Sequence, residues 1–265
     1  MKTIFFQELK SNRKSILLWC FSMALLAVFF LAIYPAFSTG AEEFKKLMAG
    51  FPPAMLKAFS FNVELIFSPM GYYALIFSYM TLCGGIYAMI LGTQVIVKDF
   101  NRKTADFLFT KPVSRIHIIA GKLVSGVLSV AVTDILAIGL TYLAALMIIG
   151  EPLESISFMR VSATLFLISL LFYVLGFLIG AIFQRIKSVI GVSIGTVFGF
   201  YVTGLLGSAL DDEKLKYLVP FQFYDPMKII REASYETYSI IATLVFVLTG
   251  LLASTLILAK RDIHV

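Results

Sequence analysis

Long apolar runs separated by short polar segments dominate the chain. Each run is long enough to cross the hydrocarbon core of a bilayer as a helix, which takes about 20 residues. The pattern therefore predicts six transmembrane helices, and six crossings place both termini on the same side of the membrane. The predicted spans are Ile16–Phe37, Tyr72–Val97, Leu123–Ile149, Val161–Phe183, Val189–Leu210 and Tyr238–Ala259.

Composition supports this prediction. The chain is 59% hydrophobic and 14% charged, with a mean hydropathy of +0.91. Soluble domains are about 45–50% apolar and about 25% charged. We therefore expect an all-α integral membrane protein that forms a single transmembrane domain over residues 1–265. Cys20 and Cys83 both lie within apolar runs, a placement that indicates neither a disulfide framework nor a metal site.

The distribution of charge predicts the orientation. Fourteen Lys and Arg residues lie in the polar segments on the side of the termini, against eight on the other side, where most acidic residues also lie. The positive-inside rule then places both termini and residues 98–122 in the cytoplasm. This topology accounts for the net charge of +6 without a nucleic-acid partner.

The basic segment 98–122 reads KDFNRKTADFLFTKPVSRIHIIAGK. Its spacing predicts a short amphipathic helix at the membrane face. That helix should end at Lys111, because Pro112 disfavours the helical conformation for the residue before it. Ser114 is placed to cap a second helix that begins near Arg115 and enters the third span. The face of the short helix comprises Phe100, Thr104, Phe107, Leu108 and Lys111.

The remaining polar segments also predict short helices. Residues 1–15 mix basic and apolar side chains, which is typical of an interfacial helix that leads into the first span. The extracytoplasmic loop 38–71 has helical spacing on each side of Pro52-Pro53, and the loop 211–237 holds an aromatic, proline-broken stretch. Two interpretations stay open for these loops: an aromatic belt at the membrane surface or a lid over a translocation path.

Small residues recur at every fourth position of the fifth span. Such a stripe lets another helix approach closely, within the subunit or between subunits. Gly176 and Gly180 add a shorter stripe in the fourth span. The fifth-span stripe consists of Gly191, Gly195, Gly199, Thr203 and Gly207.

Asp134 is the acidic residue inside a predicted span, about 18 Å along the helix axis and near mid-bilayer. A charge at that depth costs about 2.5–3.5 kcal/mol, so the side chain should face the protein interior or a wet cavity. It could be a proton or ion site, or a neutral group hydrogen-bonded to Thr133, Tyr142 or a neighbouring helix. No second charge lies in a span to pair with it, which favours the structural role.

The polar side chains along one edge of the second span either line a pathway or form hydrogen bonds between helices, and the sequence does not distinguish these two interpretations. This edge consists of Tyr79, Thr81, Tyr87, Thr93 and Gln94.

The sequence holds no catalytic constellation. The polar segments are too short for a nucleotide-binding domain. Gly121-Lys122 is similar to the end of a phosphate-binding loop, but Ile116 stands where the first glycine belongs and Leu123 where Ser or Thr belongs. We therefore expect no cofactor, metal or catalytic residue in this chain.

Three stretches carry a resemblance to a known family, the membrane subunits of ATP-binding-cassette transporters of the type-2 exporter permease family. They are FPPAMLKAF, GGIYAMILGTQVIVKDFNRKTADFLFTKPVSRIHIIAGKL and VPFQFYDPMKIIRE, and the resemblance covers essentially the whole chain. It implies that segment 98–122 is a coupling helix that docks on a separately encoded ATPase. The implied contact residues are Asp99, Arg102, Thr104, Asp106, Phe107, Lys111, Pro112, Ser114 and Arg115.

The resemblance also implies the assembly. Two permease subunits, identical or related, would face each other in a bacterial or archaeal plasma membrane, among its lipids. ATP and Mg²⁺ would bind the partner ATPase, whose closure would tilt the spans and move an amphipathic or hydrophobic cargo outward. Two alternatives from other classes remain: a secondary transporter that uses Asp134 as an ion site, and a membrane scaffold or sensor subunit without transport.

Overall fold

The structure is a computed structural model, which describes residues 2–58, 65–101, 115–183, 185–210 and 212–260. Six of its helices are long and apolar enough to cross a membrane, and the described residues contain no strand. The predicted fold class is therefore confirmed. The six long helices are α1 (Lys2–Thr39), α4 (Pro69–Asn101), α6 (Arg115–Ile149), α7 (Ser155–Ile182), α8 (Val189–Leu210) and α11 (Thr237–Lys260).

The helices extend beyond the predicted spans, most of all at the starts of α1, α6 and α7. Residues 2–15, predicted as an interfacial helix that leads into the first span, form the first turns of the same helix as that span. No proline or glycine lies between Lys2 and Tyr34, so nothing in the sequence breaks the helix there. The polar N-terminal turns continue the apolar span without a hinge.

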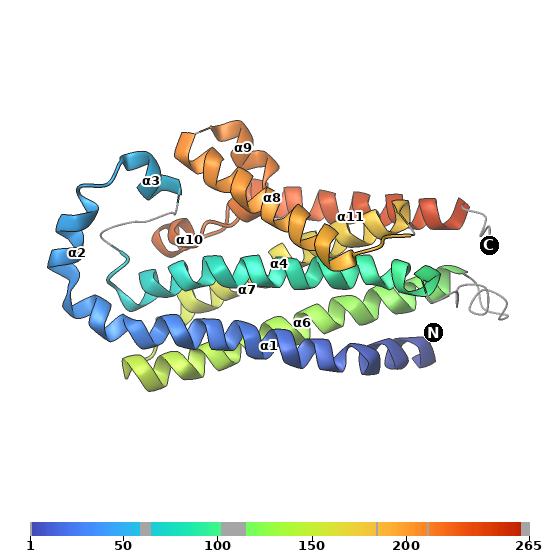
Figure 1. The fold of residues 1–265 in the computed structure, drawn as a ribbon, viewed down its shortest axis with the longest axis horizontal. Coiled ribbons are helices and arrows are strands. Elements are labelled where there is room, and N and C mark those ends of the chain that lie inside the picture. The colour runs from blue at the N-terminus through green and yellow to red at the C-terminus, as the bar shows by residue number, and fades with distance from the viewer. Residues whose placement is uncertain (1, 59–64, 102–114, 184, 211, 261–265) are drawn as a thin grey trace.

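All six long helices run roughly along one axis (Figure 1). The N-terminal end of α1, the C-terminal end of α11, the end of α4 and the start of α6 lie together at one end of the bundle, which we call the coupling end. The short helices gather at the opposite end, which we call the outer end. These are α2 (Ala41–Met48), α3 (Pro53–Ala58), α9 (Glu213–Leu218), the 3-10 helix η1 (Pro220–Gln222) and α10 (Pro226–Glu232).

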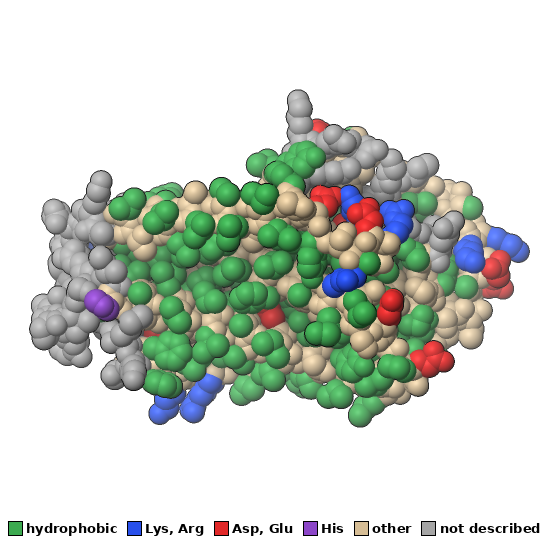
Figure 2. Space-filling model, turned by 180° about the vertical axis from the view of Figure 1, so that it is seen from behind, with side chains coloured by type: hydrophobic (Ala, Val, Ile, Leu, Met, Phe, Trp, Pro, Cys, Tyr) green, Lys and Arg blue, Asp and Glu red, His purple; other side chains and the backbone are tan. Residues whose placement is uncertain are grey.

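Helices α4 and α7 form the centre of the bundle. Within their most apolar windows 67% and 61% of the residues are buried, compared with 17% for α8 and for α11. Helix α1 packs on α6, α11 packs on α7, and α8 packs on α4. Figure 2 shows hydrophobic side chains covering the long middle of the visible face, with charged side chains mostly toward the ends. This arrangement suits a bundle whose outer helices face lipid.

The short helices at the outer end follow from local signals. Pro52 lies between α2 and α3 and Pro53 is the first residue of α3, so the helix breaks at this proline pair as the sequence predicts, and α3 packs on α8. Asp225 caps α10 by accepting a hydrogen bond from the N–H of Met227 at 2.9 Å, and Pro226 occupies the first helical position. The outer end is therefore covered by ordered helices from both predicted extracytoplasmic loops.

Candidate functional site

The coupling end presents the two helices that border residues 102–114. Helix α4 continues as far as Asn101, and α6 begins at Arg115 as predicted. Asp99 and Arg115 therefore belong to the ends of these helices. The amphipathic helix and the Ser114 cap lie outside the described residues, as do Arg102, Thr104, Asp106, Phe107, Lys111 and Pro112.

Glycines bring α4 and α7 into backbone contact behind the coupling end. A Cβ atom added at Gly92 would lie 2.0 Å from the carbonyl oxygen of Tyr173, and one added at Gly176 would lie 2.4 Å from that of Met89. A Cβ atom at Gly180 would lie 2.9 Å from the carbonyl oxygen of Thr93. Only glycine allows so close an approach of two helix backbones. The fourth-span stripe is thus a packing surface within the subunit.

Tyr173 joins this pair to α6. Its hydroxyl donates a hydrogen bond to the carbonyl oxygen of Leu123 at 3.0 Å. Gly126 makes room for the ring, because a Cβ atom there would lie 2.2 Å from the Tyr173 hydroxyl. Tyr173 therefore contacts α6 through its side chain and α4 through its backbone, and these are the two helices that flank segment 102–114.

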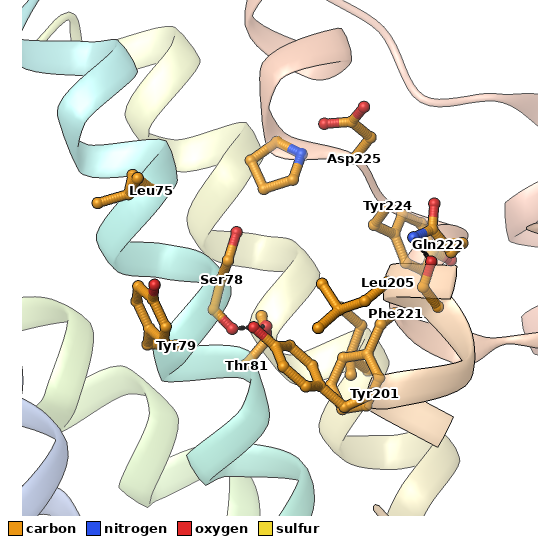
Figure 3. Close-up of a pocket in the computed structure, with 13 residues that line it drawn as sticks. Leu75, Ser78, Tyr79, Thr81, Tyr201, Leu205, Phe221, Gln222, Tyr224 and Asp225 are labelled. Carbon is orange, nitrogen blue, oxygen red and sulfur yellow. Dashed lines mark hydrogen bonds between the residues drawn. The ribbon is translucent and has the colours of Figure 1, made fainter. Parts of the chain in front are cut away.

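A cavity of about 70 Å³ lies between α4, α8 and η1 toward the outer end. Figure 3 shows Ser78, Tyr79 and Thr81 of α4 on one side and Tyr201 and Phe221 on the other. Tyr79 and Thr81 belong to the polar edge predicted for the second span, so this part of the edge lines a cavity. The rest of the edge does not line it: Tyr87 and Thr93 are buried between helices, and Gln94 lies near the coupling end.

The segment that closes this cavity is fastened by hydrogen bonds to two spans. Gln222 donates from Nε2 to the carbonyl oxygen of Gly204 at 3.1 Å and to Oγ of Ser208 at 2.8 Å, both on α8. The buried hydroxyl of Tyr224 donates to the carbonyl oxygen of Ser239 on α11 at 3.2 Å. Residues 219–226 therefore bridge α8 and α11.

A second cavity of about 270 Å³ adjoins the first and shares Gln222, Tyr224 and Asp225 with it. Burial raises the pKa of the Asp225 carboxyl above its ordinary value, and hydrogen bonds from the N–H groups of Met227 and Lys228 oppose that rise. Lys228 pairs with Glu236 at the rim. The lining is aromatic and polar, which suits the binding of an amphipathic molecule.

Asp134 lies in the middle of α6 with 1% of its surface exposed. Of the possible partners in the sequence, Thr133 and Tyr142 form no hydrogen bond with it within the described residues, and Thr133 instead donates to the hydroxyl of Tyr87 at 3.1 Å. The carboxylate lies beside the hydroxyl of Ser169 on the neighbouring helix α7, although no hydrogen bond of ordinary geometry joins the two groups. The side chain faces the protein interior, as expected.

The fifth-span stripe divides into two parts. A Cβ atom added at Gly195 or Gly199 would meet no atom within 4 Å, whereas one at Gly207 would lie 2.9 Å from Cβ of Leu215. Thr203 donates to the carbonyl oxygen of Gly199 in its own helix. Gly191 and the next two glycines of the stripe are exposed, so this face of α8 is left uncovered by the described subunit, while Val197 on the opposite face is buried.

Several residues of these sites carry no distinctive sequence signal. Gly92, Tyr173 and Gln222 stand in apolar or loop segments where many side chains could make contacts. In α4, the spacing of Gly85 and Gly92, two helical turns apart, is the sequence feature that indicates close packing against another helix.

The fold and these surfaces define a multi-pass helical membrane protein with features of a transport component. A family model described as "ABC-2 family transporter protein" matches residues 2–260, so the chain belongs to this family. It is therefore a transmembrane component of an ATP-binding-cassette transporter and not itself the ATPase. A search of curated proteins finds no match to the chain. Within the described ranges, no three His, Cys, Asp or Glu side chains gather as metal ligands.

Proposed function

We propose that this chain is the permease subunit of an ATP-binding-cassette exporter and that a separate ATPase docks on segment 98–122. The family match over residues 2–260 carries the proposal. The arrangement at the coupling end supports it, because α4 and α6 flank the basic segment and are tied to the central helix α7 through Tyr173 and Gly92. A displacement of this segment would therefore be transmitted through α4 and α6 to the central helix α7.

The ATPase contact, in this proposal, comprises the nine residues that the family resemblance implies. Asp106 and Arg115 would form charge-assisted hydrogen bonds, and Phe107 would fill an apolar groove of the ATPase. ATP and Mg²⁺ bind the partner and not this chain. The nine residues are Asp99, Arg102, Thr104, Asp106, Phe107, Lys111, Pro112, Ser114 and Arg115.

We further propose that two permease subunits assemble in a bacterial or archaeal plasma membrane. The exposed stripe of Gly191, Gly195 and Gly199 supports this assembly, because α8 offers a smooth surface that no part of the described subunit covers. The cavity between Tyr79 and Tyr201 would then belong to the outer part of the translocation path. With the adjoining cavity of about 270 Å³ it offers an aromatic and polar lining that would contact part of an amphipathic cargo such as a peptide, an antibiotic or a lipid-like molecule.

A pull-down from mild detergent tests the central claim. Wild-type permease should retain an ATPase subunit that the double variant Phe107→Asp/Arg115→Glu loses at equal expression. The matched control is Phe183→Asp/Arg185→Glu, which makes the same chemical changes at exposed residues between α7 and α8. The control should keep the ATPase. If the wild type retains no ATPase, or if both double variants lose it equally, segment 98–122 is not the docking site.

A further inference from the structure

Three helices are joined at the coupling end by one carboxylate. Oε1 of Glu8 on α1 lies 3.2 Å from Nζ of Lys122 on α6, and Oε2 of the same carboxylate lies 3.7 Å from Nζ of Lys98 on α4. Lys98 stands one turn before the end of α4, and Lys122 stands two turns after the start of α6. Glu8 thus pairs with both helices that border segment 102–114.

Polar contacts on the same face of α1 reinforce this junction. Nζ of Lys98 also donates to Oγ of Ser11 at 2.9 Å, and Nδ2 of Asn12 donates to Oγ of Ser129 on α6 at 3.3 Å. Residues 8, 11 and 12 stand at i, i+3 and i+4, so they share one face of the helix. The N-terminal turns of α1 therefore carry a polar face that fits the two bordering helices.

Burial makes the loss of one partner costlier at this junction than at a surface ion pair. The Lys122 side chain is 5% exposed, that of Glu8 is 22% exposed and that of Lys98 is 26% exposed. A pair held largely away from water is screened less by solvent and salt than an exposed pair. Removing one partner also leaves the other charge buried without compensation. The packing of α1 along α6 and α4 places the carboxylate between the two ammonium groups.

We propose that Glu8 is a positioning residue that clamps the start of α1 to both bordering helices, so that α1 moves with them when the ATPase displaces the coupling segment. The proposal rests on the proposed function for its mechanical role, but the clamp itself is a property of the permease alone. Without Glu8, the ends of α4 and α6 would move and the N-terminal turns of α1 would not follow them.

Spin-label distance measurements on the permease alone in lipid nanodiscs test the clamp. Labels at Arg13→Cys on α1 and Val124→Cys on α6, both exposed positions, would be introduced in a Cys20→Ser/Cys83→Ser background. We expect a narrow distance distribution with Glu8 and one about twofold broader with Glu8→Gln, which keeps the size of the side chain and removes its charge. The matched control is Glu43→Gln, an exposed glutamate of α2 at the outer end.

Two further arms keep the test decisive. Should Glu8→Gln fail to fold, Lys122→Gln removes the ion pair between Glu8 and α6 and should broaden the α1–α6 distance distribution. The exchange Glu8→Lys/Lys122→Glu restores this pair with the charges reversed and should give a narrow distribution. Equal widths for wild type, Glu8→Gln and Lys122→Gln would overturn the clamp, even where the ATPase co-purifies. In the complex, trapping with ATP should leave the α1–α6 label distance unchanged in the wild type, because α1 moves with α6. Glu8→Gln should retain the bound ATPase and shift this distance, because α6 then moves without α1.

Discussion

Gly92 of α4 faces the backbone of Tyr173 of α7 so closely that a Cβ atom on the glycine would lie 2.0 Å from the tyrosine carbonyl oxygen. In lipid there is little hydrophobic force between helices, so close van der Waals packing of this kind holds them together. The side chain of the same residue, Tyr173, donates to the backbone of α6. Tyr173 therefore links the centre of the bundle to both helices that flank segment 102–114.

The first prediction concerns this contact. Gly92→Ala should destabilise the protein by at least about 3 kcal/mol, the upper end of the usual cost of overpacking, because the added methyl group meets rigid backbone and not a flexible side chain. Thermal unfolding of the purified protein in detergent measures the effect.

Gly139→Ala is the matched control for this substitution. Gly139 lies in the helix α6, and a Cβ atom there would meet nothing within 4 Å. Alanine should be neutral or slightly stabilising at this position, since it favours the helix by about 1 kcal/mol over glycine. Equal melting temperatures for the two variants would show that α4 and α7 are not in backbone contact.

The hydropathy pattern was sufficient to predict the six spans, and the prolines were sufficient to predict the break between α2 and α3. The pattern did not predict which helices lie at the centre. A lipid-facing side chain and a buried one are equally apolar, so α4 and α8 look alike in the sequence. The most regular glycine stripe, in α8, is partly open, while the tight contact uses the less regular glycines of α4 and α7.

The polar contacts were harder to predict. Glu8, Lys98 and Lys122 lie far apart in the sequence, and their charges are explained equally well by the positive-inside rule. Gln222 stands in a loop where any polar residue would be unremarkable, and only the fold brings its amide to Gly204. Residues 102–114 carry most of the predicted ATPase contact and lie outside the described residues, so those assignments remain predictions.

A second prediction concerns the open stripe of α8. Gly195→Leu should leave the melting temperature of the subunit unchanged or slightly raised, because the position is open and leucine favours a helix over glycine. It should, however, shift a dimer toward monomers, because the larger side chain keeps a second backbone away. Single-molecule photobleaching of labelled protein in bilayers counts the subunits, with Gly139→Leu as the control. A dimer that persists in Gly195→Leu would place the subunit interface elsewhere.

A third prediction separates the two roles of Asp134. The interpretation as a structural, neutral group predicts that Asp134→Asn folds with an equal or higher melting temperature, since an ionisable group leaves a site with 1% exposure. ATPase activity of the reconstituted complex should then be unchanged, as should its dependence on pH. Asp134→Lys should abolish membrane expression, because a lysine is expensive at this depth. Normal folding of Asp134→Asn with lost or pH-independent ATPase activity would instead favour a role for Asp134 as a proton or ion site.

The last prediction concerns Asp225, which is outside the spans. Its pKa is raised by burial, so the folded protein binds a proton at this carboxyl more tightly than the unfolded chain does. Its contribution to stability is therefore greatest at low pH and is lost as the pH rises through the raised pKa.

Asp225→Asn should remove this pH dependence and raise the melting temperature at neutral pH, because an amide oxygen can still accept a hydrogen bond from the N–H of Met227. Asp225→Ala, which loses the helix cap, should instead cost about 0.5–2 kcal/mol relative to Asp225→Asn. Melting temperatures measured between pH 4 and pH 8 would contradict this account if they changed with pH equally in wild type and Asp225→Asn.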